Sequence, residues 1–513
     1  MSLQLGRRRL QAALRRGGTG PSVAIIGAGL SGLGMAVQLQ RAGVEGFTIF
    51  EQAGGVGGTW RENTYPGSGC DVPTHLYSFS FSPKHDWTRR FAGQEEILGY
   101  AEDLVRSHGL GPHLRLGTGI SAARFDEGVG CWRLETTTGE EVTADVLVAA
   151  VGQLNRPAVP DLEGLETFAG ARFHSARWDH GVELEGREVV VIGNGASAIQ
   201  FVPEIAPRVK ALTIFQRSSN YVVPKPDRVY GPLARFIFER VLPLELLYRW
   251  WIYWSFESRW FAFREGSAMG RHLERRFGRE VRGQLVSEDL PEAVLVPDYP
   301  LGCKRILISN DWFPALLRRN VRVETSPVAL VTPGAVLTED GARHRAEVLI
   351  FATGFDTTHF LAPITVAGTG GRTLAEAWSD GAEAHLGLTV PGFPNLFLLY
   401  GPNTNLGHNS ILFMVERQIE YVLACLAELS RRGQGALEIR PEVAERSGRA
   451  VQERLARTAW AGSCQSWYKT ASGRVTNNWP GFTVAYWAET LWPKMADFLP
   501  LAQDRPASRT PVG

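Results

Sequence analysis

The sequence predicts an α/β protein with two Rossmann-like domains, the second inserted into a discontinuous first one, and with a helical insertion. Two observations predict this fold class. Residues 23–51 and residues 188–217 each follow the order apolar strand, glycine turn, helix, strand, which is typical of a parallel sheet covered by helices. Each unit is completed much later by an apolar strand that ends in small residues, at 145–152 and at 347–354.

The length and charge of the chain narrow its possible functions. At 513 residues it is too long for one ordinary core and fits two or three domains. With 54 basic and 53 acidic residues the net charge is +1, so no dedicated nucleic-acid or anionic-membrane surface is indicated. We therefore expect small-molecule partners and no nucleic acid.

The opening segment, residues 1–21, is expected to be a flexible basic tail. It lacks the apolar stretch of a secretory signal and contains Arg7, Arg8, Arg9, Arg15 and Arg16. Elsewhere the chain has no uninterrupted apolar run of about 18 residues, so no membrane span is predicted.

Both glycine turns have the sequence context of a dinucleotide site. The first is Gly27-x-Gly29-x-x-Gly32 and the second is Gly193-x-Gly195-x-x-Ala198, and each lies between an apolar strand and a helix. The glycines let the backbone approach a pyrophosphate, whose charge then lies at the N–H groups that begin the helix. Two bound dinucleotides are therefore predicted.

The residue that ends the second strand differs between the two units. Glu51 lies 24 positions after Gly27, and Arg217 lies 24 positions after Gly193. A carboxylate here accepts hydrogen bonds from a free ribose 2′-OH, whereas a guanidinium favours a 2′-phosphate. The first site therefore predicts FAD and the second NADPH, and Ser218 is a further candidate residue of the second site.

A helical insertion is expected over about residues 226–300. Its segment Val241–Phe263 is interrupted by charged residues but is rich in tryptophan, with Trp250, Trp251, Trp254 and Trp260. Two interpretations stay open. The segment forms either an amphipathic helical hairpin packed on its own domain, or a surface for apolar substrates or for weak peripheral contact with lipid.

The chain then returns to the first domain. Phe393–Gly401 has the pattern of a buried strand, and a turn-rich stretch at 402–409 leads to a helix. The apolar stripe of that helix consists of Ile411, Val415, Ile419, Val422 and Leu426. The expected domain limits are 22–155 and 375–500 for FAD binding, 156–374 for NADPH binding, and 501–513 for a flexible tail.

The cysteines give no sign of a metal or redox centre. They are odd in number, scattered and without a Cys-x-x-Cys pair, at Cys70, Cys131, Cys303, Cys425 and Cys464. No metal site and no redox disulfide is predicted from them, and the pattern favours a reducing, cytoplasmic compartment.

The linker between the two units carries the most specific motif of the chain. Phe168-x-Gly170-x-x-x-His174-x-x-x-Trp178-Asp179 resembles the fingerprint of the type I Baeyer–Villiger monooxygenases, a family of class B flavoproteins, and the resemblance covers about residues 21–500. It implies that His174 and Trp178 couple domain movement to NADPH binding. From the residues alone, both belong to a packed linker.

A glycine-rich loop follows the first unit. Its segments Gly54–Trp60 and Tyr65–Asp71 can press against a planar ring because glycine leaves room there. The resemblance implies that Thr59, Trp60 and Asp71 line the flavin, with Asp71 near its reacting edge, and Gly58 belongs to the same candidate site. Taken alone, Asp71 is more simply a turn or helix-capping carboxylate.

The third block is Cys303-Lys304-Arg305, directly before an apolar strand. An arginine at such a place is more often part of a structural ion pair. The resemblance instead implies that Arg305 and Asp71 are the catalytic residues, with Arg305 as the cation near flavin C4a and Asp71 as the carboxylate that holds it. It also implies that Lys304 approaches the NADPH phosphate and that Gln153 lies near the flavin and the nicotinamide.

The implied reaction inserts one atom of O₂ beside a ketone carbonyl, through a C4a-peroxyflavin, and gives an ester or lactone. An arginine suits it because negative charge develops along the route. The aromatic insertion favours a bulky, apolar ketone. Two alternatives stay open: a flavin-dependent N- or S-oxygenase, which usually has Tyr or Phe in place of Trp178, and a non-enzymatic flavin-bound protein. A dithiol–disulfide reductase shares the plan of two dinucleotide sites but needs paired redox cysteines, which this sequence lacks.

Overall fold

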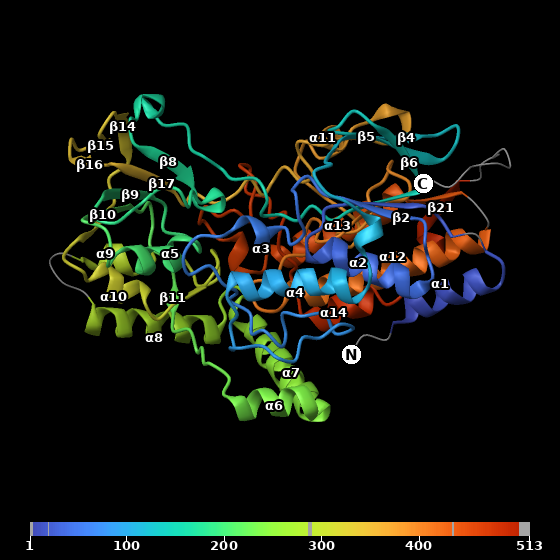
Figure 1. The fold of residues 1–513 in the computed structure, drawn as a ribbon, viewed down its shortest axis with the longest axis horizontal. Coiled ribbons are helices and arrows are strands. Elements are labelled where there is room, and N and C mark those ends of the chain that lie inside the picture. The colour runs from blue at the N-terminus through green and yellow to red at the C-terminus, as the bar shows by residue number, and fades with distance from the viewer. Residues whose placement is uncertain (1–3, 19, 286–289, 433–434, 502–513) are drawn as a thin grey trace.

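The computed structural model describes residues 4–18, 20–285, 290–432 and 435–501. Two α/β lobes lie side by side, and a helical hairpin projects below them (Figure 1). This arrangement agrees with the predicted fold class of two Rossmann-like units with a helical insertion.

The first lobe is built on a parallel sheet of order β19-β7-β1-β2-β3. Its strands are β1 (Val23–Ile26), β2 (Phe47–Phe50), β3 (Leu114–Arg115), β7 (Val146–Ala149) and β19 (Leu396–Leu398). The helices that share its core are α2 (Leu30–Ala42), α4 (Gln94–Ser107) and α12 (Ile411–Arg432). The strands predicted near residues 23, 47, 145 and 393 and the helix after residue 410 are therefore confirmed.

The second lobe repeats the plan with a parallel sheet of order β13-β10-β9-β17-β8. Its strands are β8 (Ala171–His174), β9 (Glu188–Ile192), β10 (Ala211–Phe215), β13 (Val321–Glu324) and β17 (Val348–Phe351), and its helices are α5 (Ala198–Ile205) and α10 (Trp312–Leu316). The interior strands β9 and β17 are nearly fully buried, as parallel strands covered on both faces must be.

Two smaller sheets extend the lobes. One has the order β18-β4-β5-β6, with β4 (Ile120–Asp126), β5 (Cys131–Thr136), β6 (Glu141–Ala144) and β18 (Thr365–Ala367); the other joins β14 (Val328–Thr332), β15 (Ala335–Thr338) and β16 (Arg343–Arg345). Because β18 pairs with β4, the chain is back in the first lobe by residue 365, earlier than the expected limit at residue 375.

The remaining elements are short or belong to the insertion. Two-stranded pairs join β11 (Val222–Val223) to β12 (Leu307–Ile308) and β20 (Ala436–Ile439) to β21 (Phe498–Leu501). The insertion holds α6 (Pro232–Arg240), α7 (Leu242–Glu257), α8 (Ala268–Gln284) and α9 (Glu292–Leu295), and the other helices are α3 (Thr59–Glu62), α11 (Leu374–Ala377), α13 (Pro441–Leu455) and α14 (Thr483–Glu489). None of the helices in the described ranges has the length and apolar character needed to cross a membrane.

The expectation of a flexible basic tail at residues 1–21 is wrong. Residues Leu5–Arg15 form α1, which packs on α12. The Gly6 N–H donates to the Glu420 carboxylate at 2.9 Å, Leu10 is fully buried, and Arg9 lies over the Trp492 ring. The arginines cover the outer side of an amphipathic helix whose inner side is apolar. The tail expected at 501–513 lies outside the described residues, apart from Leu501 at the end of β21.

A disulfide that the scattered cysteines did not predict joins Cys303 to Cys464. The two residues are 161 positions apart in the sequence, and their Cα atoms are 6.2 Å apart. Cys70, Cys131 and Cys425 are free and buried. The bond ties the segment that precedes Lys304 to a loop of the other lobe's carboxyl-terminal part.

Candidate functional site

A cavity of about 1650 Å³ lies at the carboxyl ends of the strands of the first sheet and reaches the start of α5. This is where ligands bind in open α/β sheets. Nine predicted site residues line it, namely Gly27, Gly29, Glu51, Gly58, Thr59, Trp60, Asp71, Gln153 and Arg305. The lining does not include Gly32, Gly193, Gly195, Ala198, Arg217, Ser218 or Lys304.

The first glycine turn leaves space beside this cavity. Gly27 has φ of 103°, and a Cβ there would lie 2.7 Å from the Ala150 carbonyl oxygen. A Cβ on Gly32 would lie 1.9 Å from the Gly27 oxygen, so Gly32 lets α2 pack closely on the turn. At Gly29 a Cβ would meet only the Gly58 Cα, at 3.7 Å. Gly29 therefore keeps open a space next to the N-terminus of α2, as a pyrophosphate requires.

Glu51 is buried at the end of β2 and binds the turn itself. Its two carboxylate oxygens accept hydrogen bonds from the Ala28 and Ala53 N–H groups, both at 2.8 Å. The carboxylate also faces the cavity. The sequence predicted that Glu51 would bind the ribose. It did not predict that Glu51 also stabilises the glycine turn.

The loop after the first unit surrounds the centre of the cavity. Gly57 and Gly58 have φ of 119° and 53°, a region that favours glycine, and they lead directly into Thr59 and Trp60. The Trp60 indole N–H donates to the Tyr77 hydroxyl at 3.2 Å. Tyr77, which the sequence analysis missed, thereby fixes the orientation of Trp60.

Gln153 is fixed by the surrounding backbone. Its amide nitrogen donates to the carbonyl oxygens of Tyr400 and Gly401 at 3.0 and 3.2 Å, and its amide oxygen accepts from Asn477 at 3.1 Å. The side chain is buried yet lines the cavity. These bonds tie the end of β7 to the segment that follows β19.

Asp71 and Arg305 meet across 234 positions of sequence. The Arg305 guanidinium donates to the Asp71 carboxylate in a salt bridge, and their side chains are 35% and 27% exposed, respectively, because both face the cavity. Asp71 raises the pKa of Arg305 further above its ordinary value. The pair is therefore a permanent cation held in place by a carboxylate.

Two tyrosines beside Arg305 were not predicted. Tyr400 and Tyr468 line the cavity, and burial raises the pKa of each phenol above its ordinary value, so both are neutral hydroxyls. Tyr400 has φ of 59°, a conformation that is uncommon for a residue other than glycine. Its place at the end of the predicted strand Phe393–Gly401 was a usable signal, whereas no sequence pattern marks Tyr468.

The second glycine turn has the same backbone geometry and a different charge. Gly193 has φ of 104°, and a Cβ there would lie 2.4 Å from the Ala352 oxygen. The Lys304 ammonium lies 2.5 Å from the Ser218 hydroxyl. Burial, and then the charge of Arg217, lower the pKa of Lys304. Three predicted residues therefore converge into a polar, cationic cluster beyond the end of β10.

The linker motif is packed rather than open. His174 ends β8 and is buried, and this burial lowers its pKa to about 4, so the ring is neutral near pH 7. Trp178 packs against Phe173 and against Phe201 of α5, with ring centroids 5.1 and 5.2 Å apart. A Cβ on Gly170 would lie 2.2 Å from the Glu347 oxygen. These contacts agree with the packed-linker interpretation drawn from the residues alone.

Comparison with known proteins identifies the family. A model described as pyridine nucleotide-disulphide oxidoreductase matches residues 24–230. A Baeyer–Villiger monooxygenase of Streptomyces coelicolor is 44% identical over 93% of this chain and 92% of its own. One of Pseudomonas aeruginosa is 44% identical over 91% of this chain and 89% of its own.

Solved structures agree. A steroid monooxygenase bound to NADP superposes with a TM-score of 0.83 at 29% identity, covering 94% of this chain and 100% of that one. A cyclohexanone monooxygenase of Rhodococcus sp. Phi1 bound to NADP⁺ gives a TM-score of 0.82 at 28% identity, covering 92% and 97%. By its sequence, its fold and the residues around its cavity, the chain belongs to the Baeyer–Villiger monooxygenase family.

Proposed function

We propose that this protein is an FAD- and NADPH-dependent Baeyer–Villiger monooxygenase that uses O₂ to convert an apolar ketone to an ester or lactone. The observation that carries the proposal is the Asp71–Arg305 pair, which faces the same cavity as the first glycine turn. Family membership supports it, since relatives at 44% identity carry this name.

The chain's residues fit FAD at the first unit. The open space at Gly29, the N-terminus of α2 and the glycine loop before Thr59 form one continuous wall of the cavity. The helix N–H groups would receive the pyrophosphate, and the glycine loop would contact the flat ring. When bound and reduced by NADPH, the flavin supplies the activated oxygen of the reaction.

NADPH would be held by the cationic cluster of the second unit. Arg217 is exposed, and Lys304 lies against Ser218. The pKa of Lys304 is lowered first by its burial and then by repulsion from the neighbouring charge of Arg217. A 2′-phosphate between them relieves that repulsion, whereas the plain 2′-OH of NADH does not.

Arg305 would act as the catalytic cation. Attack on a ketone carbonyl produces a tetrahedral oxyanion, and a fixed cation in a site sheltered from water stabilises it far more than one in bulk solvent. Asp71 orients the guanidinium, which stays protonated at any working pH, and it raises the pKa of Arg305 further. Asp71 is therefore a positioning residue.

The insertion favours an apolar substrate. It contributes the side chains of Phe263, Leu273 and Phe277 to the wall of the cavity. Apolar lining of this kind binds by burial and selects weakly among ketones of similar size. A cytoplasmic location stays a prediction, and the Cys303–Cys464 bond weighs against the reducing compartment expected from the cysteine pattern.

The proposal is tested with purified holoenzyme, NADPH, ¹⁸O₂ and a panel of long-chain, cyclic and aryl ketones. Mass spectrometry should find an ester or lactone that carries one ¹⁸O atom. A panel of amines and sulfides run in parallel tests the alternative N- or S-oxygenase. Oxygenated amine or sulfide with no ester from any ketone would overturn the Baeyer–Villiger assignment, and bound flavin with no NADPH turnover at all would favour the non-enzymatic alternative.

A further inference from the structure

Helix α7 is apolar on its outer side as well as on the side that packs against the body. Glu245, Ile252 and Phe256 are buried on the inner side. Leu247, Trp250 and Trp254 follow the spacing i, i+3, i+7, which places them on one opposite face, and they are 61%, 62% and 44% exposed. A soluble helix normally carries polar residues there.

The apolar surface continues over the rest of the hairpin. Phe238 of α6 stacks on Tyr248 of α7, with ring centroids 5.4 Å apart, so the two helices form one unit. The other exposed large apolar residues of this unit are Leu233, Phe236, Val241, Leu242, Leu244, Leu246 and Trp251. A patch of this extent marks an interaction site.

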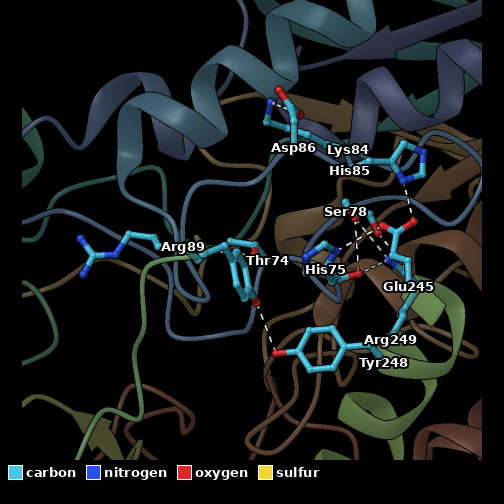
Figure 2. Close-up of polar contacts among 11 residues, drawn as sticks. Thr74, His75, Ser78, Lys84, His85, Asp86, Arg89, Glu245, Tyr248 and Arg249 are labelled. Carbon is cyan, nitrogen blue, oxygen red and sulfur yellow. Dashed lines mark hydrogen bonds and ion pairs between the residues drawn. The ribbon is translucent and has the colours of Figure 1, made fainter. Parts of the chain in front are cut away.

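Polar contacts fix the base of the hairpin to the first lobe, as Figure 2 shows. The two carboxylate oxygens of buried Glu245 lie 3.2 Å from His75 Nδ1 and 2.5 Å from His85 Nδ1. Arg249 donates to the His75 carbonyl oxygen and to the Ser78 hydroxyl. These bonds hold the inner side of α7 against the body, so the outer side stays directed away from it.

The charges around the patch are mainly positive. Over residues 228–266, which are all described, the exposed basic residues are Arg228, Arg240, Arg259 and Arg264, whereas the exposed acids are Glu239 and Glu265. Helix α8, at the lower edge of Figure 1, adds one exposed acid, Glu280, and five exposed arginines, namely Arg271, Arg275, Arg276, Arg279 and Arg282. The net charge of +1 for the whole chain does not show this because the balancing acids lie elsewhere.

We propose that the outer face of the α6–α7 hairpin docks on the surface of an anionic phospholipid bilayer. Tryptophan rings favour the headgroup region, leucine and phenylalanine the acyl boundary, and flanking arginines the anionic headgroups. The hairpin projects from the body (Figure 1), and a bilayer accommodates such a shape without a matching hollow. The mixture of exposed tryptophan and leucine with flanking arginines is typical of a helix at a lipid surface, so we commit to lipid, and the oligomeric state of the variant tests the alternative of a second copy.

The test is sedimentation of the holoenzyme with vesicles of phosphatidylcholine that contain increasing phosphatidylglycerol. The bound fraction should rise with phosphatidylglycerol and fall with salt. The variant Leu247→Ser/Trp250→Ser/Trp254→Ser should lower the partition coefficient by about tenfold or more, since each side chain loses its apolar contact with lipid. Arg228→Glu/Arg240→Glu should weaken binding to the anionic vesicles by about 30-fold or more, because each substitution removes an attractive charge and adds a repulsive one.

The matched control is Leu116→Ser/Leu317→Ser, which changes apolar residues that are 41% and 53% exposed outside the hairpin and should bind vesicles like the wild type. Unchanged circular dichroism and thermal midpoint would show that each variant is folded. Wild-type protein that stays in the supernatant at every lipid composition overturns the proposal. The proposal is also overturned if the hairpin variant binds vesicles as well as the wild type. A third contrary outcome is a wild-type protein that binds no lipid and forms a dimer, with a hairpin variant that is a monomer.

Discussion

The two dinucleotide units share a backbone and differ in what ends their second strand. Their first glycines have φ of 103° and 104°, and both turns lie between a buried parallel strand and a helix. Glu51 is buried and satisfied by two backbone N–H groups, whereas Arg217 is exposed beside a second cation. The fold thus provides the phosphate cradle twice. The first site has a buried carboxylate at this position and the second an exposed guanidinium; we call them the enclosed site and the open site.

The largest expected effect comes from placing a side chain in the glycine turn of the enclosed site. At Gly29 the protein itself leaves room for a side chain, with only the Gly58 Cα at 3.7 Å, so Gly29→Val should fold but exclude the pyrophosphate. Purified protein should be colourless. Gly195→Val is the matched change in the second unit, where nothing lies within 4 Å of the added Cβ. It should stay yellow and lose NADPH affinity, and stoichiometric flavin in Gly29→Val would contradict the comparison.

Removing the Arg305 guanidinium should have the next largest effect. Arg305→Ala should keep FAD and lose about 10²- to 10³-fold in the rate of ester formation, as expected when an oriented charge donor is lost. NADPH oxidation that releases hydrogen peroxide is the accompanying readout. Lys304→Ala, one residue away, is the control and should form ester normally at saturating NADPH. An Arg305→Ala variant with wild-type ester yield would show that another group stabilises the oxyanion.

The open site is tested by coenzyme preference. Arg217→Ala removes a charge-assisted contact of about 1.5–3 kcal/mol and should lower kcat/KM for NADPH by roughly 10- to 100-fold, with little change for NADH. Because Lys304 lies in the same cluster, Arg217→Ala/Lys304→Ala should lose more of the preference. An equal fall for both coenzymes would mean that Arg217 supports the fold instead.

The smallest expected effect is on stability in acid, and we expect it from two buried neutral histidines, one in each lobe. Burial lowers the pKa of His174 in the second lobe and of His385 in the first to about 4, from 6.5. The unfolded chain therefore binds more protons, and stability should fall as the pH drops from about 6.5 towards 4, by about 2 kcal/mol per histidine at pH 5.

Replacement of either histidine tests this pH dependence. Urea denaturation at pH 7.5 and pH 5 should show a smaller loss in His174→Asn or in His385→Asn than in the wild type. An identical loss in both variants and the wild type would contradict the assignment of neutral, buried rings.

Much of this comparison could be predicted from the sequence, because glycine spacing and apolar strands act locally. The strands, the two turns and the contrast of Glu51 with Arg217 follow from that local chemistry. The Asp71–Arg305 contact was reached only through family resemblance, since residue order does not report a meeting across 234 positions. Helix α1 was not predicted because the many arginines of this segment suggested a tail. The residues Gly6, Leu10 and Ala13 form the buried side of the helix.

Other parts of the site were not predictable. Tyr468 and the Cys303–Cys464 bond depend on how a late loop folds back over the earlier domain, and no local pattern encodes that return. The exposed face of α7 was visible as a tryptophan-rich segment, but only the structure shows which of its sides packs against the body.

Because Cys303 and Cys464 form a disulfide, the oxidation state of a preparation affects the rates that are measured with it. Cys303 directly precedes Lys304 and Arg305, and the segment after Cys464 carries Trp467 and Tyr468 into the cavity wall. Both cysteines are buried, and reduction of the bond would release these two stretches of backbone from each other. Rates from reduced and oxidised preparations therefore belong to two covalently different molecules, and a thiol count should accompany every reported activity.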